Sequence, residues 1–288
     1  MTKLDTAHKN FVSHLKEVGR SNSTVIAYEK DIEQLIEFLF KKGVNLVNEI
    51  QTLHLKEFME KLTNEGFTPK SISRKTNSTK TFFKFLIEHG HVVENHADNI
   101  KHPKVDTKAP RILSKVEYRA LRDAVKADAR TYAIIEILLQ TGIRISELAN
   151  IKIADITFDS NPRIYVPKIG SNPAREIPLN KAAVVAINEY MKIRPEAQID
   201  HLFITKSGRP LLVRNIRATI DRFFKLAGIE NAKVNDLRHT FVAHHLAQGV
   251  SITVVSKIAG HKRISTTEKY LQYIEISVNI EKHELSEL

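Results

Sequence analysis

The sequence predicts a mainly α-helical protein of two domains, in which the second domain carries a small antiparallel β-hairpin. Apolar residues recur at near-helical spacing through most of the 288 residues, and glycines and prolines interrupt the pattern. Residues 100–113 contain two prolines and five basic side chains with little periodicity, which is typical of a linker between domains. Two short runs, at 163–166 and 175–179, flank a Gly-Ser-Asn-Pro turn and predict the hairpin.

Four helices are expected in the first domain, which we place at residues 1–104. The first covers about 4–18, the second runs from the Ser21–Ser23 cap cluster to Gly43, the third from Thr52 to Gly66, and the fourth from Pro69 to Glu88. Thr68 is expected to cap the fourth helix. Pro69 suits the first helical position, where its missing N–H costs nothing.

The fourth helix is expected to face DNA. Its basic side chains are Lys70, Arg74, Lys75, Lys80 and Lys84. No acidic residue lies between Glu65 and Glu88, and short hydroxyls and amides lie among the basic groups. Such groups suit phosphate and groove contacts. A solvated helix face is the alternative, but the lack of neighbouring acids favours the DNA-facing interpretation.

A linker at 105–111 leads to a second domain at 112–288. Ser114 and Glu117 form a capping-box pattern at its start. Helices are expected at about 115–126, 129–140, a short segment through Glu147, 181–193, 213–227, 236–248, 251–259, 265–272 and 275–286. Only the hairpin shows strand character, so this domain is expected to be mostly helical with a small sheet.

The composition is that of a soluble globular protein, with 42% hydrophobic and 27% charged residues. The absence of cysteine excludes disulfides, thiolate zinc sites and cysteine nucleophiles. No apolar stretch reaches the length of a membrane span, and the N-terminus lacks the apolar region of a signal peptide. We therefore expect no membrane partner and a cytoplasmic, nucleoid-associated location.

The charge points to a polyanionic partner. The formal net charge is +11, and residues 111–288 carry 27 basic and 19 acidic side chains against 17 and 14 in residues 1–110. Neutralising phosphates releases their counterions, so such an excess favours nucleic-acid binding. A merely basic soluble protein is the alternative.

Three segments of the second domain together supply two guanidiniums, an imidazole and a phenol. These are Arg144 within 141–148, Arg238 within 235–239, and His261 and Tyr270 within 260–270. Two arginines can clamp the non-bridging oxygens of one phosphodiester bidentately, which lysine cannot reproduce. Fixed guanidiniums also stabilise the charge that develops on a pentacoordinate phosphorus.

Tyr270 is the candidate nucleophile of this group. A phenol is a weak nucleophile near neutral pH because its pKa is about 10, and we expect cationic neighbours to lower that pKa. Ser265, Thr266 and Thr267 are expected to cap a helix, which would place the phenol near a positive helix N-terminus. A phosphotyrosyl link would store the energy of the DNA bond, so neither ATP, nor a metal, nor another cofactor is expected.

With these motifs in this order, nearly the whole chain resembles the tyrosine recombinase, or phage integrase, family, and within it the Xer-type enzymes. The motifs are Thr-Gly-Ile-Arg-Ile-Ser-Glu-Leu, Leu-Arg-His-Thr-Phe, Gly-His…Ser-Thr-Thr-x-x-Tyr and, in the first domain, Ser-Ile-Ser-Arg-Lys. The resemblance implies that Arg144 and Arg238 clamp the phosphate and that His261 is the second-box imidazole. It also implies that Tyr270, rather than Tyr273, is the nucleophile.

The resemblance implies a lysine on the hairpin that protonates the leaving 5′ oxygen. Lys168 matches this position, although the turn is about two residues longer than the Gly-Lys-Gly of typical members. The register of the match is therefore open, and Arg175 is the other basic side chain nearby. A lysine donates a proton far more readily than an arginine.

The second box departs from the family pattern His-x-x-Arg, because Asn235 stands at the first position. An asparagine can donate a hydrogen bond to a phosphate oxygen but cannot relay protons. It can also serve as the N-cap of the helix at 236–248. We expect an active enzyme in which Asn235 is a passive phosphate donor.

Two further residues are expected to support the site. His239 follows Arg238 and is expected to buttress it or to pack. Glu147 would share a helix face with Arg144 and orient local structure. His239, His244 and His245 lack the spacing of metal ligands, so no metal is expected.

The resemblance also implies an assembly. Two domains would form a C-shaped clamp around double-stranded DNA, and four identical or paralogous protomers would recombine two sites through 3′-phosphotyrosyl intermediates and a Holliday junction. The amphipathic helix expected at 274–288 would dock on a neighbouring protomer, although packing on its own domain is the alternative. The rival functions are a type IB topoisomerase-like activity and a catalytically impaired DNA-binding protein.

Overall fold

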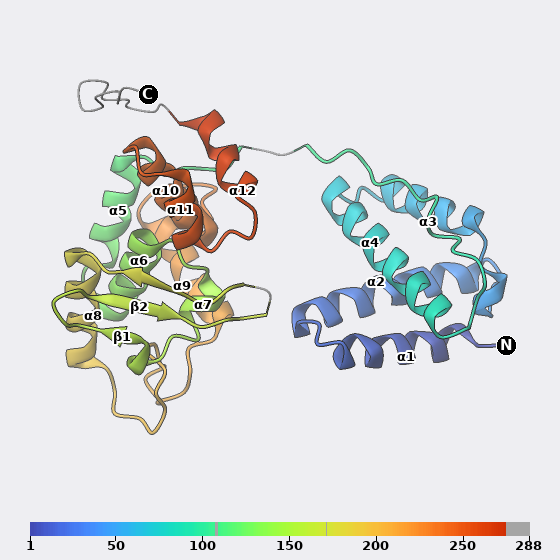
Figure 1. The fold of residues 1–288 in the computed structure, drawn as a ribbon, viewed down its shortest axis with the longest axis horizontal. Helices are drawn as coiled ribbons and strands as arrows, with labels where there is room; N and C mark the ends of the chain where they lie inside the picture. The colour runs from blue at the N-terminus through green and yellow to red at the C-terminus, as the bar shows by residue number, and fades with distance from the viewer. Residues whose placement is uncertain (107–108, 171, 275–288) are drawn as a thin grey trace, which may run out of the picture. The chain divides into compact units, whose positions relative to one another are not determined.

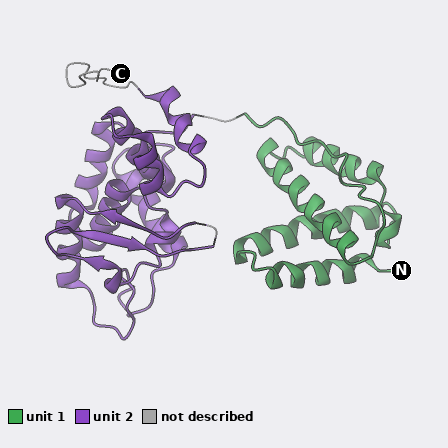
Figure 2. Ribbon diagram, viewed as in Figure 1, with its two compact units in different colours: residues 1–108 green, residues 109–288 purple. Residues whose placement is uncertain are grey.

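A computed structural model describes residues 1–106, 109–170 and 172–274 of the chain. It divides into two compact units, Met1–Lys108 and Ala109–Leu288 (Figure 2). The predicted division near residue 105 lies close to this one. The helix predicted at 275–286 lies outside the described residues, as does the tail at 274–288 beyond Ile274.

Unit 1 contains the four predicted helices. They are α1 (Leu4–Glu17), α2 (Asn22–Lys41), α3 (Thr52–Asn64) and α4 (Pro69–Glu88), with a 3₁₀ turn at Val47–Glu49 (Figure 1). The Ser21 hydroxyl accepts a hydrogen bond from the Thr24 amide, and the Thr68 hydroxyl accepts one from the Ser71 amide. Local capping chemistry therefore sets where α2 and α4 begin.

Aromatic side chains hold α1 against α4. The ring of Phe11 on α1 lies 5.2 Å from that of Phe82 and 5.6 Å from that of Phe85, both on α4. All three side chains are buried, together with most of the apolar residues of α2 and α3. Unit 1 thus has a hydrophobic core of its own.

Unit 2 is mostly helical. Its helices are α5 (Lys115–Val125), α6 (Ala129–Thr141), α7 (Ile145–Leu148), α8 (Lys181–Ile193), α9 (Val213–Leu226), α10 (Val234–Ala247), α11 (Ile252–Ala259) and α12 (Ser265–Glu268), with 3₁₀ turns at Ile153–Asp155 and Lys269–Tyr273. Helix α6 is apolar almost all round and is buried among α5, α8, α9 and α10.

A three-stranded antiparallel sheet covers part of unit 2. Its strands are β1 (Ile156–Thr157), β2 (Arg163–Val166) and β3 (Arg175–Pro178), in the order β1-β2-β3 (Figure 1). The predicted hairpin is β2–β3, in which Ile164 pairs with Ile177 and Val166 with Arg175. The third strand, β1, was not predicted, because two residues are too short to show strand alternation.

The predicted fold class is confirmed: a mainly helical protein with four helices in the first domain and a small antiparallel sheet in the second. Among the helices of the described residues, none has the length and apolar character needed to cross a membrane.

Candidate active site

Helix α6 ends in a sharp turn that places Arg144. Gly142 adopts a left-handed conformation, with φ of +62°, and a Cβ there would overlap the ring of Phe241. Only glycine fits this close approach. After the turn, Arg144 donates a hydrogen bond from Nη2 to the Gly260 carbonyl at 3.0 Å. The arginine of the first motif is thus joined to the backbone of the third.

Glu147 is fully buried and paired with Arg175. The two terminal nitrogens of Arg175 donate to the two carboxylate oxygens at 3.1 and 2.9 Å, and Arg144 Nη1 donates to the same carboxylate at 3.2 Å. Burial alone would raise the pKa of Glu147, but the hydrogen bonds from Arg175 and from the Arg144 amide outweigh it and lower that pKa. Glu147 is therefore the anion that orients both arginines.

The guanidinium of Arg175 is fully engaged in hydrogen bonds. Its Nε donates to the Ile258 carbonyl at 2.6 Å, so all three guanidinium nitrogens are occupied by buried partners. In the folded protein, the guanidinium of Arg175 therefore supports the buried carboxylate of Glu147.

Arg238 lies on α10 with only 5% of its surface exposed. Its Nη1 donates to the Gly142 carbonyl at 2.5 Å, whereas its buried Nη2 has no hydrogen-bond partner within the described part of the chain. Burial, followed by the charge of Arg144, lowers the pKa of Arg238 to about 10. A buried guanidinium donor without an acceptor is costly, and an anionic ligand would satisfy it.

Tyr270, His261 and His239 converge beside Arg238. His239 Nδ1 lies 2.5 Å from the Tyr270 phenol oxygen. The ring of His261 stacks on that of Tyr270, with the two ring centroids 6.4 Å apart. Tyr270 is 5% exposed, while Tyr273 is 41% exposed. The chain thus encloses the predicted nucleophile and leaves its rival at the surface.

The pKa of Tyr270 shifts opposite to the expected direction. Burial raises the pKa of the phenol, and Arg238 lowers it by less. The expectation that cationic neighbours would lower this pKa is therefore wrong for this arrangement, because desolvation of the phenolate outweighs the attraction to Arg238.

The Ser-Thr-Thr triplet does not cap a helix, in contrast to the prediction. Helix α12 is only four residues long, its N-cap position is Ile264, and Tyr270 lies in the 3₁₀ turn that follows. Instead, the Thr267 hydroxyl is buried and lies 2.7 Å from His261 Nδ1. Thr267, the last residue of the triplet, therefore orients the imidazole. Burial, together with the charge of Arg238, lowers the pKa of His261 to about 4.

Asn235 is not the N-cap of α10, because that helix begins at Val234, two residues earlier than predicted, and its N-cap position is Lys233. The Asn235 amide nitrogen lies 2.8 Å from His239 Nε2. His239 therefore uses its two ring nitrogens for Asn235 and Tyr270, and neither of them bonds to Arg238.

Lys168 is exposed beyond the end of β2, in the turn of the hairpin. The Asn172 amide donates to the Ile169 carbonyl at 3.0 Å across this turn. No hydrogen bond or ion pair joins Lys168 to another residue within 1–106, 109–170 or 172–274. The structure therefore does not bring Lys168 to the other candidate residues, and its role stays a prediction.

A hollow of about 440 Å³ opens beside Arg238 and Asn235. Arg217 from α9 and Lys233 also line it. The sequence analysis did not single out these two basic residues, because neither belongs to a motif. Arg217 comes near Arg238 through the packing of α9 against α10, whereas Lys233 is the N-cap of the helix that carries Arg238. Asp221 of α9 lines the same hollow, so its carboxylate offsets part of the positive charge that these two residues add.

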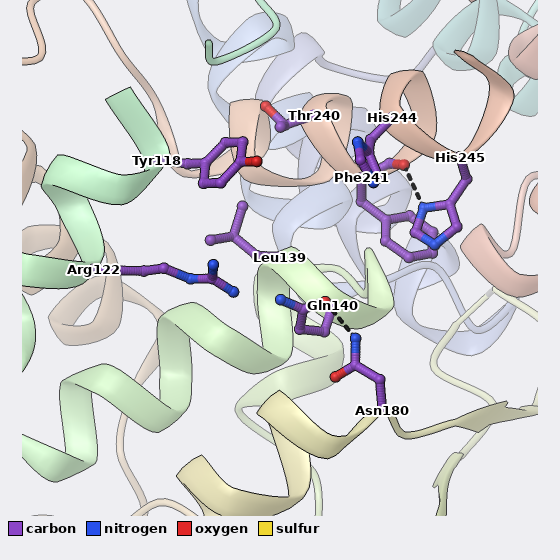
Figure 3. A pocket seen from close by; sticks show the side chains of 9 residues that line it. All are labelled: Tyr118, Arg122, Leu139, Gln140, Asn180, Thr240, Phe241, His244 and His245. Carbon is purple, nitrogen blue, oxygen red and sulfur yellow. Dashed lines mark hydrogen bonds between the residues drawn. The ribbon is translucent and has the colours of Figure 1, made fainter. Parts of the chain in front are cut away.

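A separate cavity of about 190 Å³ lies between α5, α6 and α10 (Figure 3). It is lined by Tyr118, Arg122, Leu139, Gln140, Asn180, Thr240, Phe241, His244 and His245. His245 donates from Nδ1 to the Phe241 carbonyl at 2.9 Å. None of these residues belongs to the predicted catalytic set.

Lys75 of α4 is not at the surface, so its predicted role in DNA contact is wrong. It is 3% exposed, and its Nζ lies 2.9 Å from Oδ1 of Asp31 on α2 and 2.5 Å from the Gln34 side-chain oxygen. The acid that neutralises Lys75 lies 44 positions away in the sequence, which a search along α4 alone could not find.

The other basic residues of α4 differ in their surroundings. Arg74 also pairs with Asp31 but keeps 45% of its side chain exposed. Lys80 donates to the Asp98 carbonyl at 3.2 Å. Lys70 and Lys84 are exposed, and Lys84 lies 3.6 Å from Glu88. Of the short polar groups between them, Thr76, Ser78 and Thr79 are buried rather than available to DNA.

Two family descriptions match the chain. Residues 110–275 match the phage integrase family, and residues 9–90 match the phage integrase N-terminal SAM-like domain. The chain is 31% identical over 258 residues to the tyrosine recombinase XerC of Staphylococcus carnosus, covering 87% of this chain and 86% of that one. It is 29% identical over 273 residues to a tyrosine recombinase of Pseudothermotoga lettingae, covering 93% of each.

Solved structures share the fold. A lambda integrase dimer bound to a COC′ core site matches with a TM-score of 0.76 at 17% identity, covering 100% of this chain and 80% of that one. The XerH recombinase bound to a palindromic difH substrate matches with a TM-score of 0.75 at 19% identity, covering 94% and 83%.

Proposed function

The chain belongs to the phage integrase family of tyrosine recombinases, which cut and rejoin DNA, and from this premise we propose that Tyr270 is its nucleophile. The reaction would be site-specific strand exchange through a 3′-phosphotyrosyl intermediate.

One observation carries this proposal: the buried phenol of Tyr270 lies beside Arg238, whose Nη2 finds no acceptor among the described residues. A non-bridging oxygen of a DNA phosphate would accept from that nitrogen. Arg144, which the Gly260 carbonyl and Glu147 orient, would hold the same phosphate from a second side.

Cleavage of the DNA strand by Tyr270 needs no added reagent. The Tyr270 oxygen forms a bond to phosphorus while its proton leaves to water, and the bond from phosphorus to the 5′ oxygen breaks. The leaving oxygen takes a proton from the Lys168 ammonium. The two guanidiniums stabilise the charge on the equatorial oxygens of the transition state, and the reverse attack by a 5′ hydroxyl rejoins a strand.

Support for Lys168 as the proton donor is its place in the hairpin turn together with the commitment of Arg175 to buried partners. A lysine on an exposed turn can approach a bound phosphate, whereas Arg175 cannot leave Glu147 without breaking two hydrogen bonds to a buried carboxylate. We propose that the hairpin brings Lys168 to the 5′ oxygen when DNA binds.

The test uses a nicked substrate, whose short 5′ fragment diffuses away after cleavage and traps the intermediate. We expect a denaturation-resistant protein–DNA adduct that EDTA does not affect, that Tyr270→Phe abolishes, and that Tyr273→Phe leaves in place. The absence of an adduct with the native chain would favour the impaired DNA-binding protein. Relaxation of supercoiled plasmid without paired sites would favour the topoisomerase-like activity.

The partners we propose are double-stranded DNA and three further protomers, identical or paralogous. The related lambda integrase was crystallised as a dimer on its core site. Exchange of two strand pairs through a Holliday junction needs four nucleophiles, so a tetramer on two sites is the smallest complete assembly. The segment 274–288 would link neighbouring protomers in it.

A further inference from the structure

We propose that Asn235 and His239 form a positioning pair for the nucleophile. The Asn235 amide fixes the tautomer of His239, and that tautomer donates a hydrogen bond from Nδ1 to the Tyr270 phenol oxygen. The catalytic meaning of the pair rests on the proposed role of Tyr270, but its geometry and its tautomer do not.

The two side chains lie one helical turn apart on the same face of α10. The amide nitrogen of Asn235 lies 2.8 Å from His239 Nε2, and His239 Nδ1 lies 2.5 Å from the Tyr270 oxygen. The three groups form one chain of hydrogen bonds that ends on the phenol, and each ring nitrogen of His239 has one partner in it.

The chemistry of the amide decides the direction of these bonds. The side-chain amide nitrogen of Asn235 has two N–H donors and cannot accept a hydrogen bond. It therefore donates, and His239 Nε2 accepts. A neutral imidazole has one proton, which must then lie on Nδ1. Nδ1–H donates to the Tyr270 oxygen, and this bond grows stronger as negative charge develops on that oxygen.

The surroundings keep the ring neutral. Burial lowers the pKa of His239, Asp236 opposes the shift and Arg238 adds to it. Tyr270 faces Arg238, and the ring of His261 stacks on it from another element. His239 therefore enters the site near neutral pH with a single proton, and the position of that proton depends on Asn235.

This arrangement gives Asn235 a role that the phosphate-donor interpretation did not contain. Where the family pattern has a histidine, this chain has a residue that cannot titrate, and its amide instead selects the donor form of His239.

The tautomer can be measured directly in the full chain labelled with ¹⁵N-histidine, by two-bond ¹⁵N–¹H correlations at pH 8. The chain supplies internal references: His245 donates from Nδ1 to the Phe241 carbonyl, and His8 donates from Nε2 to the Glu29 carbonyl. We expect the His239 signal, assigned with His239→Leu, to show the Nδ1–H pattern of His245. A pattern like that of His8 would overturn the proposal.

Asn235→Asp tests whether the Asn235 amide sets the tautomer of His239. A carboxylate accepts hydrogen bonds and cannot donate them, so it favours a proton on Nε2 of His239. We therefore expect that the Nδ1–H tautomer is no longer the only form of His239 in this variant. His244→Gln, on the same helix but lining the separate cavity, should leave the His239 signal unchanged. An unchanged His239 tautomer in Asn235→Asp would refute the role of Asn235.

Cleavage of the nicked substrate tests the effect on the nucleophile. His239→Leu removes the donor and should slow adduct formation about 10- to 100-fold, the range expected for one hydrogen bond to a charged group. In this variant the rate of adduct formation should also reach its plateau at a higher pH than in the native chain, because the Tyr270 phenol must ionise without a hydrogen bond from His239. His239→Asn places an amide near the position of Nδ1 and should restore most of the rate; equal rates for both variants would contradict the proposal.

A substrate with sulfur in place of the 5′ bridging oxygen separates this role from that of Lys168. Sulfur leaves without protonation, so this substrate should rescue Lys168→Ala but not His239→Leu. Rescue of His239→Leu would place His239 with the leaving group and overturn the inference. If the native chain forms no adduct while the Nδ1–H tautomer is observed, the proposed function fails and the positioning geometry stands.

Discussion

Gly260 lies beside Arg144 and Arg175, two arginines that the Glu147 carboxylate holds in the candidate active site. Its carbonyl accepts the hydrogen bond from Arg144, and its backbone adopts φ of +68°. A Cβ at this position would lie 2.7 Å from Cζ of Arg175. That guanidinium is held by the buried carboxylate of Glu147, so it cannot retreat without breaking the pair.

We therefore expect Gly260→Ala to lower the free energy of unfolding by about 2–4 kcal/mol, measured by urea titration, and to slow adduct formation. Gly249→Ala is the matched control, because Gly249 has φ of +79° but no atom within 4 Å of an added Cβ. It should cost about 1 kcal/mol from backbone strain alone. Equal losses for the two variants would show that the contact with Arg175 is unimportant.

His261 links the site to the pH dependence of stability. Burial and Arg238 lower its pKa to about 4, below the ordinary value of 6.5. Between those values the unfolded chain binds the proton and the folded chain does not, so this contribution to stability is present above pH 6.5 and is lost as pH falls towards 4.

We expect the free energy of unfolding to fall between pH 7 and pH 5, with about 1 kcal/mol of the change due to His261 after allowance for its partial exposure. Urea titrations of the native chain and of His261→Gln at both pH values check this. The difference between the two pH values should be smaller in the variant; an unchanged difference would mean that the folded protein does not suppress protonation of this imidazole.

Helix α4 shows how one element divides its basic residues between core and surface. Lys75, Ser78 and Thr79 face inward, where Asp31 accepts from Lys75 and Ser78. Lys70 and Lys84 face outward. The helix therefore has a buried polar network on one side and exposed cations on the other.

We predict opposite effects for two lysines of this helix. Lys75→Ala breaks a buried ion pair and should lower the free energy of unfolding by about 3 kcal/mol. Lys70→Ala should leave stability within about 0.5 kcal/mol but weaken DNA binding and reduce the slope of log affinity against log salt by about 1. Urea titration and binding at several salt concentrations measure both. Weaker DNA binding by Lys75→Ala without loss of stability would contradict the assignment.

The elements were predictable where the signal is local. The bounds of α2 and α4 follow from Ser21, Thr68 and Pro69, which act within one helical turn. Strand β1 has no such signal, because its two residues are strand only through pairing with β2. The motif spacing was enough to select the arginines, the imidazole and the phenol, which the fold then brings together.

The partners of these residues were not predictable, because they come from distant parts of the chain. Asp31 pairs with a residue 44 positions away, and Arg175 with Glu147, 28 positions away. The contact between Asn235 and His239 is the exception: their spacing of four was visible, with His239 on the helix predicted at 236–248 and Asn235 directly before it. Interpreting Asn235 as a cap, rather than as a helical residue, concealed it.

At the level of the whole molecule, the excess positive charge lies mainly in the second half, with 27 basic and 19 acidic side chains in residues 111–288. Buried pairs such as Arg175 with Glu147 cancel within the fold. Arg238 is different, because its Nη2 lacks a partner among the described residues. The uncompensated charge therefore includes the candidate active site itself, and DNA binding should weaken steeply with salt.

Assembly on DNA provides the last prediction. Residues 274–288 carry apolar side chains at Ile276, Val278, Ile280 and Leu285 among acidic ones, a pattern that suits docking of an amphipathic helix. If this segment docks on a neighbouring protomer, deletion of residues 276–288 should lower cooperative binding to paired sites while affinity for a single half-site is kept. Gel-shift titrations with one and two half-sites measure both, with Leu285→Ala as a milder variant. Unchanged cooperativity together with lower stability would mean instead that the segment packs on its own domain.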